Sequence, residues 1–431
     1  MSTAADDSPP PFWDRYIVLG FLCLMAVIAY VQRAALSVPA KDIAADLKFA
    51  NQALDMQWVF FCWYFTYAIF QIPSGRFADR LGSRWALAVL CVVWSLVTAA
   101  AGLTTSFTSL MVVWGLMGLA QAGAFPCAAK AIGQIFPDTE RARASGILAS
   151  GMMIGSAIGP YLTGRLLHVF SATELGHQYP SWRIVFGVYA IPGILWVLAF
   201  LMTVSSHRLP HSSPQQLAAT GKPIDWSRVF RSGSLALLCG QQFFRAAAMV
   251  FFATWFPSFL QETRNVSMRE SGDLTTIVGV GGVLGSLCGG FSSDWLLKTT
   301  GNSRLSRQGV AVVGLGTCSV LILASYFVKD VRAATGLIAV GAFFATLGGV
   351  SGYTVAIKFG GNQVATVFSI MNMCGNIGSS LFPLAAGQLV KRTGNWNLML
   401  FLFAGIMAID AICWAFLNPK GTLFGDERED R

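Results

Sequence analysis

Runs of about twenty apolar residues, separated by short polar segments, recur along the whole chain. Each run is long enough to cross the hydrocarbon core of a bilayer as a helix, which takes about 20 residues. Twelve such runs occur, near residues 15–36, 55–77, 85–104, 108–132, 144–167, 183–204, 233–260, 272–296, 309–328, 333–357, 364–389 and 395–417. The pattern predicts an all-α membrane protein with twelve transmembrane helices.

Composition supports this interpretation and indicates an orientation. The chain has 431 residues, of which 54% are hydrophobic and only 12% charged, whereas soluble proteins carry about 25% charged residues. With the N-terminus inside, most Lys and Arg fall in cytoplasmic segments, as the positive-inside rule requires. The net charge of +9 is then explained by topology, without a nucleic-acid partner. We expect a multi-pass protein of the inner (plasma) membrane with both termini in the cytoplasm.

The longest polar connection divides the chain into two parts. Residues 205–231 are rich in Ser, Pro and basic residues and separate six apolar runs from six more. We therefore expect two six-helix bundles, with cytoplasmic segments at the centre and at both ends. The predicted parts are an N-terminal tail at 1–14, a bundle at 15–204, a central loop at 205–231, a second bundle at 232–417 and a C-terminal tail at 418–431.

The two halves carry related motifs. GRFADRLGSR, with Gly75 and Asp79, follows the second run, and GGFSSDWLLK repeats that spacing with Gly290 and Asp294 after the eighth. GSAIGPYLTG in the fifth run and GSSLFPLAAG in the eleventh also share their Gly and Pro spacing. Duplicated halves predict pseudo-symmetric bundles with a binding site between them near the bilayer midplane.

Two arginines lie inside apolar runs. Arg33 occurs in AVIAYVQRAALSVP and Arg245 in CGQQFFRAAAMVFF, at related places in the first helix of each half. A buried guanidinium costs at least ~2.5 kcal/mol in a bilayer. A carboxylate held by both arginines would offset that cost, because guanidinium donates two parallel hydrogen bonds to it. Bonds to helix carbonyls or snorkelling are the alternative explanation.

Other polar residues in the spans are weaker candidates for contact with the same ligand. Tyr67 offers a hydroxyl, while Asn372, Asn376 and Gln241 offer amides that need partners when buried. Ordinary packing and hydrogen bonds between helices explain them equally well.

The quoted motifs resemble the major facilitator superfamily over nearly the whole chain. YVQRAALSVP, YAIFQIPSGRFADRLG, GLAQAGAFPCAAKAIGQIFPDTERARASG and FSIMNMCGNIGSS are most similar to the anion:cation symporter branch, which contains hexuronate and galactonate transporters, vesicular glutamate transporters and sialin. The resemblance implies that the loop motif latches cytoplasmic helix ends in one conformation. The residues that would form this latch are Gly75, Asp79, Arg80, Arg84 and Asp294.

The chain departs from that branch where proton-coupled relatives carry ionisable residues. Gln32, Trp114 and Gln121 stand at those positions, and glutamine takes up no proton near neutral pH. We expect Gln121 to contact the substrate instead. Asp410 is an acid within the last run, on a helix that packs outside the cavity in this superfamily, so we expect a structural role for it.

Enzyme chemistry is not indicated. The nine Cys lie in apolar runs without metal-ligand spacing, and no phosphate-binding loop or nucleophile motif occurs. We expect a monomer without cofactor or metal that transports a small organic anion, a sugar acid or related carboxylate, by alternating access without the usual proton-coupling acids. An organophosphate/phosphate exchanger and a transporter-like nutrient sensor remain alternatives.

Overall fold

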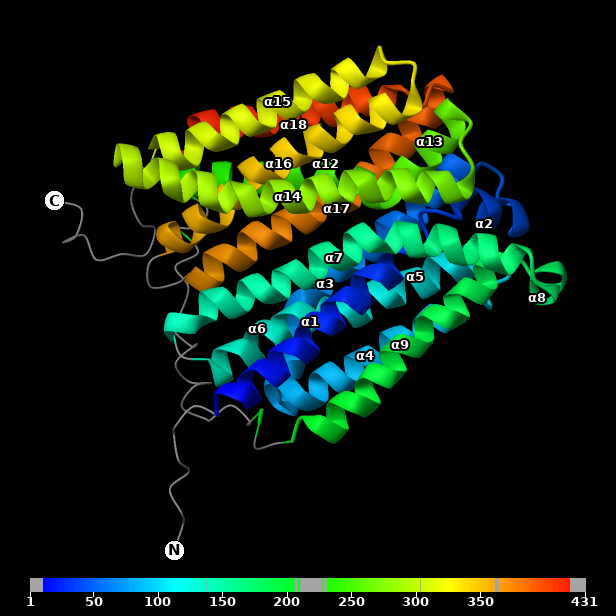
Figure 1. Ribbon diagram of the computed structural model, residues 1–431, viewed down its shortest axis with the longest axis horizontal. Helices are drawn as coiled ribbons and strands as arrows, with labels where there is room; N and C mark the ends of the chain where they lie inside the picture. The colour runs from blue at the N-terminus through cyan, green and yellow to red at the C-terminus, as the bar shows by residue number, and fades with distance from the viewer. Residues whose placement is uncertain are drawn as a thin grey trace, which may run out of the picture.

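Two bundles of long helices lie side by side in the computed structural model of the protein (Figure 1). The structure describes residues 11–136, 138–205, 208–209, 227, 231–302, 304–360 and 364–418. Within these ranges the regular secondary structure is helical, which confirms the all-α prediction. Most of the predicted central loop and of the two predicted tails falls outside the described residues.

The first bundle contains the helices up to residue 203. Its elements are α1 (Phe12–Ala34), α2 (Ala40–Asp46), α3 (Gln52–Leu81), α4 (Ser83–Ala101), α5 (Phe107–Ala122), α6 (Ala124–Ile135), α7 (Asp138–Ser171), α8 (Glu174–Gln178) and α9 (Ser181–Thr203). The short helices α2 and α8 lie at the end of the molecule away from the chain termini (Figure 1). We call this the distal end.

The second bundle begins at residue 233 and repeats the first in outline. Its elements are α12 (Gly233–Thr254), α13 (Phe256–Arg264), α14 (Met268–Thr300), the π-helical turn η1 (Arg304–Gly309), α15 (Val310–Tyr326), α16 (Val331–Gly360), α17 (Val364–Thr393) and α18 (Leu398–Phe416). In each half one crossing is interrupted. The α5–α6 crossing breaks at Gly123, and the α12–α13 crossing breaks at Trp255, followed by Pro257 in the first turn of α13.

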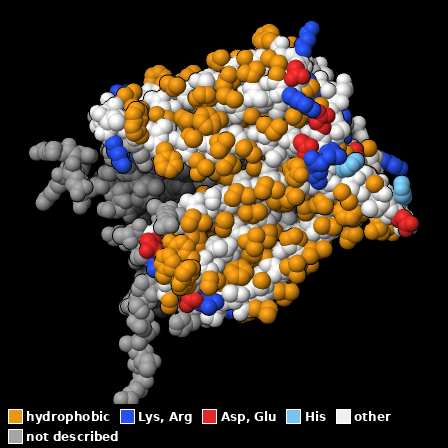
Figure 2. Space-filling model, viewed as in Figure 1, with side chains coloured by type: hydrophobic (Ala, Val, Ile, Leu, Met, Phe, Trp, Pro, Cys, Tyr) orange, Lys and Arg blue, Asp and Glu red, His pale blue; other side chains and the backbone are white. Residues whose placement is uncertain are grey.

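The twelve predicted spans are confirmed. Ten segments of the described chain are long and apolar enough to cross a membrane. The other two are α3 and α17, each of 30 residues, which pack against one another where the bundles meet. Figure 2 shows hydrophobic side chains over the middle of the visible face, with most charged side chains toward its two ends. This distribution fits helices surrounded by lipid.

Close packing between α1 and α7 sets the position of the first helix. A Cβ atom at Gly155 of α7 would lie 2.5 Å from the carbonyl oxygen of Val27 and 2.8 Å from Cβ of Tyr30. Only glycine allows this approach. Consequently Tyr30 is held against α7, and Arg33 follows one turn later on the same helix.

The bundles are joined at the distal end. Lys41 of α2 pairs with Glu262 of α13 at 2.9 Å, and Arg165 of α7 pairs with Asp273 of α14 at 3.3 Å. Gln261 of α13 also donates a hydrogen bond to the Val38 carbonyl. Among the described residues, these are the ion pairs that connect the two bundles, so the structure is closed at its distal end.

Candidate functional site

Arg33 lies in the last turn of α1, inside a ring of aromatic side chains. Its Cζ atom is 4.0 Å from the ring centre of Trp63, 4.2 Å from that of Tyr30 and 5.2 Å from that of Tyr67. The negative faces of aromatic rings attract a cation, by about 2 kcal/mol or more where water is excluded. The rings therefore offset part of the cost of placing this charge inside the bundle.

The hydrogen-bonding groups of Arg33 are only partly used. Nη2 donates to Oε1 of Gln121 over a long 3.4 Å, and the buried Nε has no hydrogen-bond partner. No carboxylate among the residues that the structure describes forms an ion pair with Arg33. Aromatic rings surround the guanidinium, and its unpaired Nε retains a donor for an anion.

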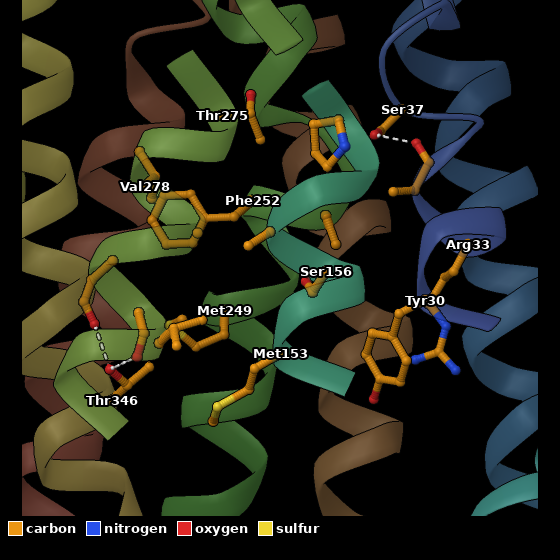
Figure 3. A pocket seen from close by; sticks show the side chains of 18 of the residues that line it. Tyr30, Arg33, Ser37, Met153, Ser156, Met249, Phe252, Thr275, Val278 and Thr346 are labelled. Carbon is orange, nitrogen blue, oxygen red and sulfur yellow. Dashed lines mark hydrogen bonds between the residues drawn. The ribbon is translucent and has the colours of Figure 1, made fainter. Parts of the chain in front are cut away.

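A cavity of about 240 Å³ opens beside Arg33, between the two bundles. The first bundle contributes residues of α1, α3 and α7, and the second contributes residues of α12, α14 and α16. Figure 3 shows Arg33 and Tyr30 at one side of this cavity and Phe252, Met249 and Val278 at the other. A site shared by both bundles changes shape when the bundles move relative to each other, as alternating access requires.

A second and smaller cavity lies behind Arg33, within the first bundle. Its volume is about 20 Å³, enough for one water molecule. Tyr67 and Gln121, two of the predicted contacts, line it together with Arg33. Gln121 also donates to the Ala29 carbonyl at 3.3 Å, so it holds α1 and α5 together directly below the guanidinium.

Gln32, at the position of an acid in proton-coupled relatives, is turned away from the cavity. Its side chain is 1% exposed, and its Nε2 donates to the Tyr189 carbonyl of α9 at 2.6 Å. Trp114 of α5, another such position, is buried against Phe186 of α9. Both residues thus serve packing inside the first bundle.

Arg245 does not line the cavity. It donates a hydrogen bond to Gln242 one turn earlier and packs on α16, where a Cβ atom at Gly349 would lie 2.9 Å from its Cδ. The structure thus brings Arg33 to the cavity but places Arg245 inside the second bundle. The two-arginine site stays a prediction.

The predicted amide contacts also lie away from the cavity. Asn372 of α17 donates to Gln71 of α3 at 3.3 Å, which links the bundles, and Asn376 donates to the Asn372 carbonyl at 3.1 Å. Gln241 donates to the Leu238 carbonyl at 2.9 Å and approaches Sδ of Met371. Their role as substrate contacts stays a prediction.

Asp410 is enclosed in the second bundle. It is 0% exposed, and neither carboxylate oxygen has a hydrogen-bond partner among the described residues. Its helix, α18, packs against α12 and α15, and Arg245 is a charged group that interacts with it electrostatically. Asp410 therefore interacts with Arg245 and is not part of the described lining of the cavity.

The predicted latch falls mainly outside the described side chains. The structure does not describe the side chains of Asp79, Arg80 and Asp294, or the surroundings of Gly75. Arg84 is described, and it donates to the carbonyls of Leu201 and Val204 at the end of α9. This places Arg84 within the first bundle, where a cation at a helix C-terminus is stabilising.

The aromatic side chains around Arg33 include Tyr30 and Trp63, which the sequence did not mark as site residues, although Tyr30 opens the quoted motif YVQRAALSVP. Tyr30 precedes Arg33 by one turn, and Trp63 precedes Tyr67 by one turn with its ring stacked on that of Tyr67 at 5.0 Å. The sequence alone shows the one-turn spacing of these residues on each helix. It does not show that α1 packs against α3, which brings the rings to the guanidinium.

Comparison with known proteins identifies the family. The chain matches the Major Facilitator Superfamily over residues 22–357 and 242–430. It belongs to the major facilitator superfamily. The resemblance predicted from the motifs is confirmed at this level and, through the relatives below, for the anion:cation symporter branch.

Bacterial proteins named as transporters are similar over almost their whole length. The hexuronate transporter of Bacillus subtilis is 30% identical, with 92% of this chain and 93% of the relative covered. The Probable sulfoacetate transporter SauU of Cupriavidus necator is 29% identical, with 95% of each chain covered. The D-galactonate transporter of Escherichia coli is 26% identical, with 94% of this chain and 95% of the relative covered.

Solved structures show the same fold. A bacterial homolog of the human lysosomal transporter Spinster, in an inward-facing and unoccupied conformation, matches with a TM-score of 0.74 at 20% identity, covering 94% of this chain and 95% of that one. At this identity the likeness shows the fold alone: twelve helices in two bundles.

Proposed function

We propose that this protein carries a small organic anion across the bacterial inner membrane by alternating access, with Arg33 as the group that binds the anion. The names of its relatives, which transport hexuronate, galactonate and sulfoacetate, support sugar acids and related small anions as the substrate class. Both termini would lie in the cytoplasm, as the distribution of basic residues indicates.

The observation that carries this proposal is the incomplete pairing of Arg33. It is surrounded by aromatic rings, its Nε is buried without a partner, and it borders a cavity between the bundles. An uncompensated cation at this depth marks a functional site. A bound carboxylate or sulfonate would supply the missing negative charge and accept the unused hydrogen bonds.

The fold supplies a route for the bound anion. The distal ends of the bundles are held by the Lys41–Glu262 and Arg165–Asp273 pairs. Rocking of one bundle against the other would break these pairs and open the cavity at the distal end. Arg33 stays with the first bundle in both states, so the anion remains bound while access changes.

We also propose that transport needs no proton gradient. Gln32 is buried against α9 and Gln121 is bonded to Arg33 and to α1. Neither side chain ionises near neutral pH. Within the described part of the chain, the cavity lining contains no carboxylate and no histidine. The remaining mechanisms are exchange, facilitated diffusion or symport with another cation.

Binding and flux of purified protein test the proposal together. Thermal-shift and calorimetric titration with sugar acids, short carboxylates, sulfonates and sugar phosphates should show saturable binding that Arg33→Gln abolishes. Arg33→Lys should weaken it at least about tenfold, because the bidentate fork is lost. The control is Arg332→Lys, an exposed arginine at the start of α16, which should bind normally.

The same titration separates the alternatives. Sugar phosphates preferred over every carboxylate would favour an organophosphate exchanger. Arg33-dependent binding without flux in proteoliposomes would favour a sensor. Normal binding and flux by Arg33→Gln would show that the anion site lies elsewhere.

A further inference from the structure

The cavity beside Arg33 is charged at one end and apolar over most of its wall. We propose that its substrate is a monoanion with a small apolar body, a compact aliphatic or aromatic carboxylate, in preference to a polyhydroxylated acid or a diacid. This inference rests on the proposed function, keeps its small organic anion at the same site, and favours an apolar acid over the sugar acids that the names of the relatives suggest.

The shape of the lining gives the first argument. Arg33 and Tyr30 form one side, and Met249, Phe252 and Val278 of the second bundle form the opposite side (Figure 3). A ligand with its carboxylate on Arg33 extends its body against thioether, phenyl and isopropyl groups. Contact of such a wall with carbon makes the binding free energy more favourable. Removal of water from hydroxyl groups of the ligand makes it less favourable.

The hydroxyl groups of the wall give the second argument. Ser37 donates to the Ala34 carbonyl at 3.0 Å, Thr275 to the Ser271 carbonyl at 2.7 Å, and Thr346 to the Gly282 carbonyl at 2.7 Å. Their protons are used, so these oxygens can only accept. The remaining hydroxyls of the lining belong to Ser156, Tyr30 and Tyr64. A sugar acid presents several hydroxyl groups that both donate and accept, and the three bonded hydroxyls supply no donor to their lone pairs.

Charge gives the third argument. Arg33 is the one charged side chain among the described residues that line the cavity, and Arg245 is bonded to Gln242 inside the second bundle. The second carboxylate of a diacid would lie against Phe252 or Val278. A buried anion without a cation or donor is strongly disfavoured there.

Size sets the upper limit. The cavity of about 240 Å³ is smaller than the roughly 300–1,000 Å³ of pockets for drug-sized ligands. It suits a body of one small ring or a short branched or linear chain.

Four six-carbon acids test this proposal with matched size. Hexanoate is an apolar monoacid, adipate an apolar diacid, gluconate a polyhydroxylated monoacid and glucarate a polyhydroxylated diacid. We expect the purified full-length protein to bind hexanoate at least about tenfold more tightly than the other three, because unpaired polar groups in an apolar pocket discriminate this strongly. The signal that Arg33→Gln gives with hexanoate measures partition into detergent or lipid, and it is subtracted from that of the wild-type protein.

A cavity variant tests the same point from the side of the protein. Met249→Gln places an amide with a donor and an acceptor in the wall, so the preference for hexanoate over gluconate should fall about tenfold. The control is Met202→Gln on α9, whose side chain is 88% exposed, which should keep the wild-type preference. An unchanged preference in Met249→Gln contradicts the proposal.

The two levels of the proposal fail in different ways. Arg33-dependent binding of gluconate or glucarate that equals or exceeds that of hexanoate overturns the apolar substrate class and leaves the anion transporter intact. Absence of Arg33-dependent binding for all four acids and for the wider anion set overturns the proposed function, and this inference with it.

Discussion

The guanidinium of Arg33 lies over the indole of Trp63, with Cζ 4.0 Å from the ring centre, and Trp63 is 1% exposed. A contact of this kind, away from water, stabilises the cation by about 2 kcal/mol or more. It also restricts the position of the guanidinium beside the cavity that Arg33 lines. Trp63 is thus expected to orient the residue that binds the anion.

Replacement of Trp63 tests this orientation. Trp63→Leu removes the aromatic face and should weaken anion binding at least about tenfold, whereas Trp63→Phe retains a π-face and should keep most of the affinity. Calorimetric titration of the folded fraction measures both. Trp94→Leu is the control, since Trp94 is 0% exposed on α4 and has no contact with Arg33. Equal losses in Trp63→Leu and Trp94→Leu would attribute the effect to general destabilisation.

Arg245 should respond differently from Arg33. It lies outside the cavity lining, bonded to Gln242 and close in charge to Asp410. We expect Arg245→Lys to keep anion affinity within about threefold of wild type while lowering thermal stability, because replacing this arginine costs packing on α16 and the hydrogen bond to Gln242. Loss of affinity as large as in Arg33→Lys would instead support the two-arginine site that the sequence pattern predicts.

The comparison of these arginines shows what the sequence could and could not predict. Twelve spans were predictable because bilayer thickness sets the length of each apolar run. Arg33 and Arg245 were recognisable as intramembrane charges for the same reason. Which of them faces the cavity depends on helix rotation, where successive residues turn by about 100°, and on contacts such as that of Arg245 with Gly349. No local pattern encodes those contacts.

The substitutions at proton-coupling positions illustrate the same limit. Gln32 and Gln121 were identified by position, and their inability to ionise follows from residue type alone. Their environments required the structure, in which Gln32 bonds to α9 while Gln121 supports Arg33. The group of aromatic side chains around Arg33 depends on the packing of α1 against α3. Long-range packing of this kind cannot be predicted from one sequence.

The distal ion pairs should set the balance between access states. Lys41→Gln removes the 2.9 Å pair with Glu262, and partly exposed pairs contribute about 0.2–1 kcal/mol. Hydrogen exchange in the segment Phe256–Arg264 should therefore rise by about 1.4- to 5-fold. Combining Lys41→Glu with Glu262→Lys should restore the wild-type rate.

A matched pair within one bundle serves as the control for this measurement. Arg183 of α9 pairs with Asp46 of α2 at 2.8 Å, and both belong to the first bundle. Arg183→Gln should leave exchange in the segment Phe256–Arg264 unchanged. An equal rise in this variant would mean that the second bundle responds to any loss of charge at the distal end.

Close packing of α7 and α14 should be required for closure at the distal end. A Cβ atom at Gly272 would lie 2.5 Å from the Pro160 carbonyl oxygen. Overpacking costs about 1–3 kcal/mol, so Gly272→Ala should reduce the closed population by about 5- to 150-fold. Substrate counterflow should slow while equilibrium binding persists. Gly316→Ala, where no heavy atom lies within 4 Å, should transport normally, and unimpaired counterflow by Gly272→Ala would refute the role of this contact.

Transport should not depend on a proton gradient. A proton-driven carrier needs an ionisable group on the pathway that binds a proton in one access state and releases it in the other. Gln32 and Gln121 cannot do so, and the described lining of the cavity holds no acid or histidine. Proteoliposomes with the membrane potential clamped should therefore exchange anion at the same rate with and without an inward proton gradient. The gradient alone should drive no accumulation.

Asp410 decides how a contrary result would be interpreted. It is 0% exposed on α18 and lies near Arg245, away from the cavity. A buried carboxylate can take up a proton in place of its charge, so Asp410 is the residue to replace if gradient-driven accumulation occurs. Suppose that the wild-type protein accumulates anion and that Asp410→Asn abolishes this accumulation while anion binding is retained. The coupling site would then lie on α18 and would act through Arg245. Accumulation that survives Asp410→Asn would require a proton site other than Asp410 and outside the described lining of the cavity. Gradient-independent exchange in both proteins, with Asp410→Asn changing stability alone, is the outcome that the structure predicts.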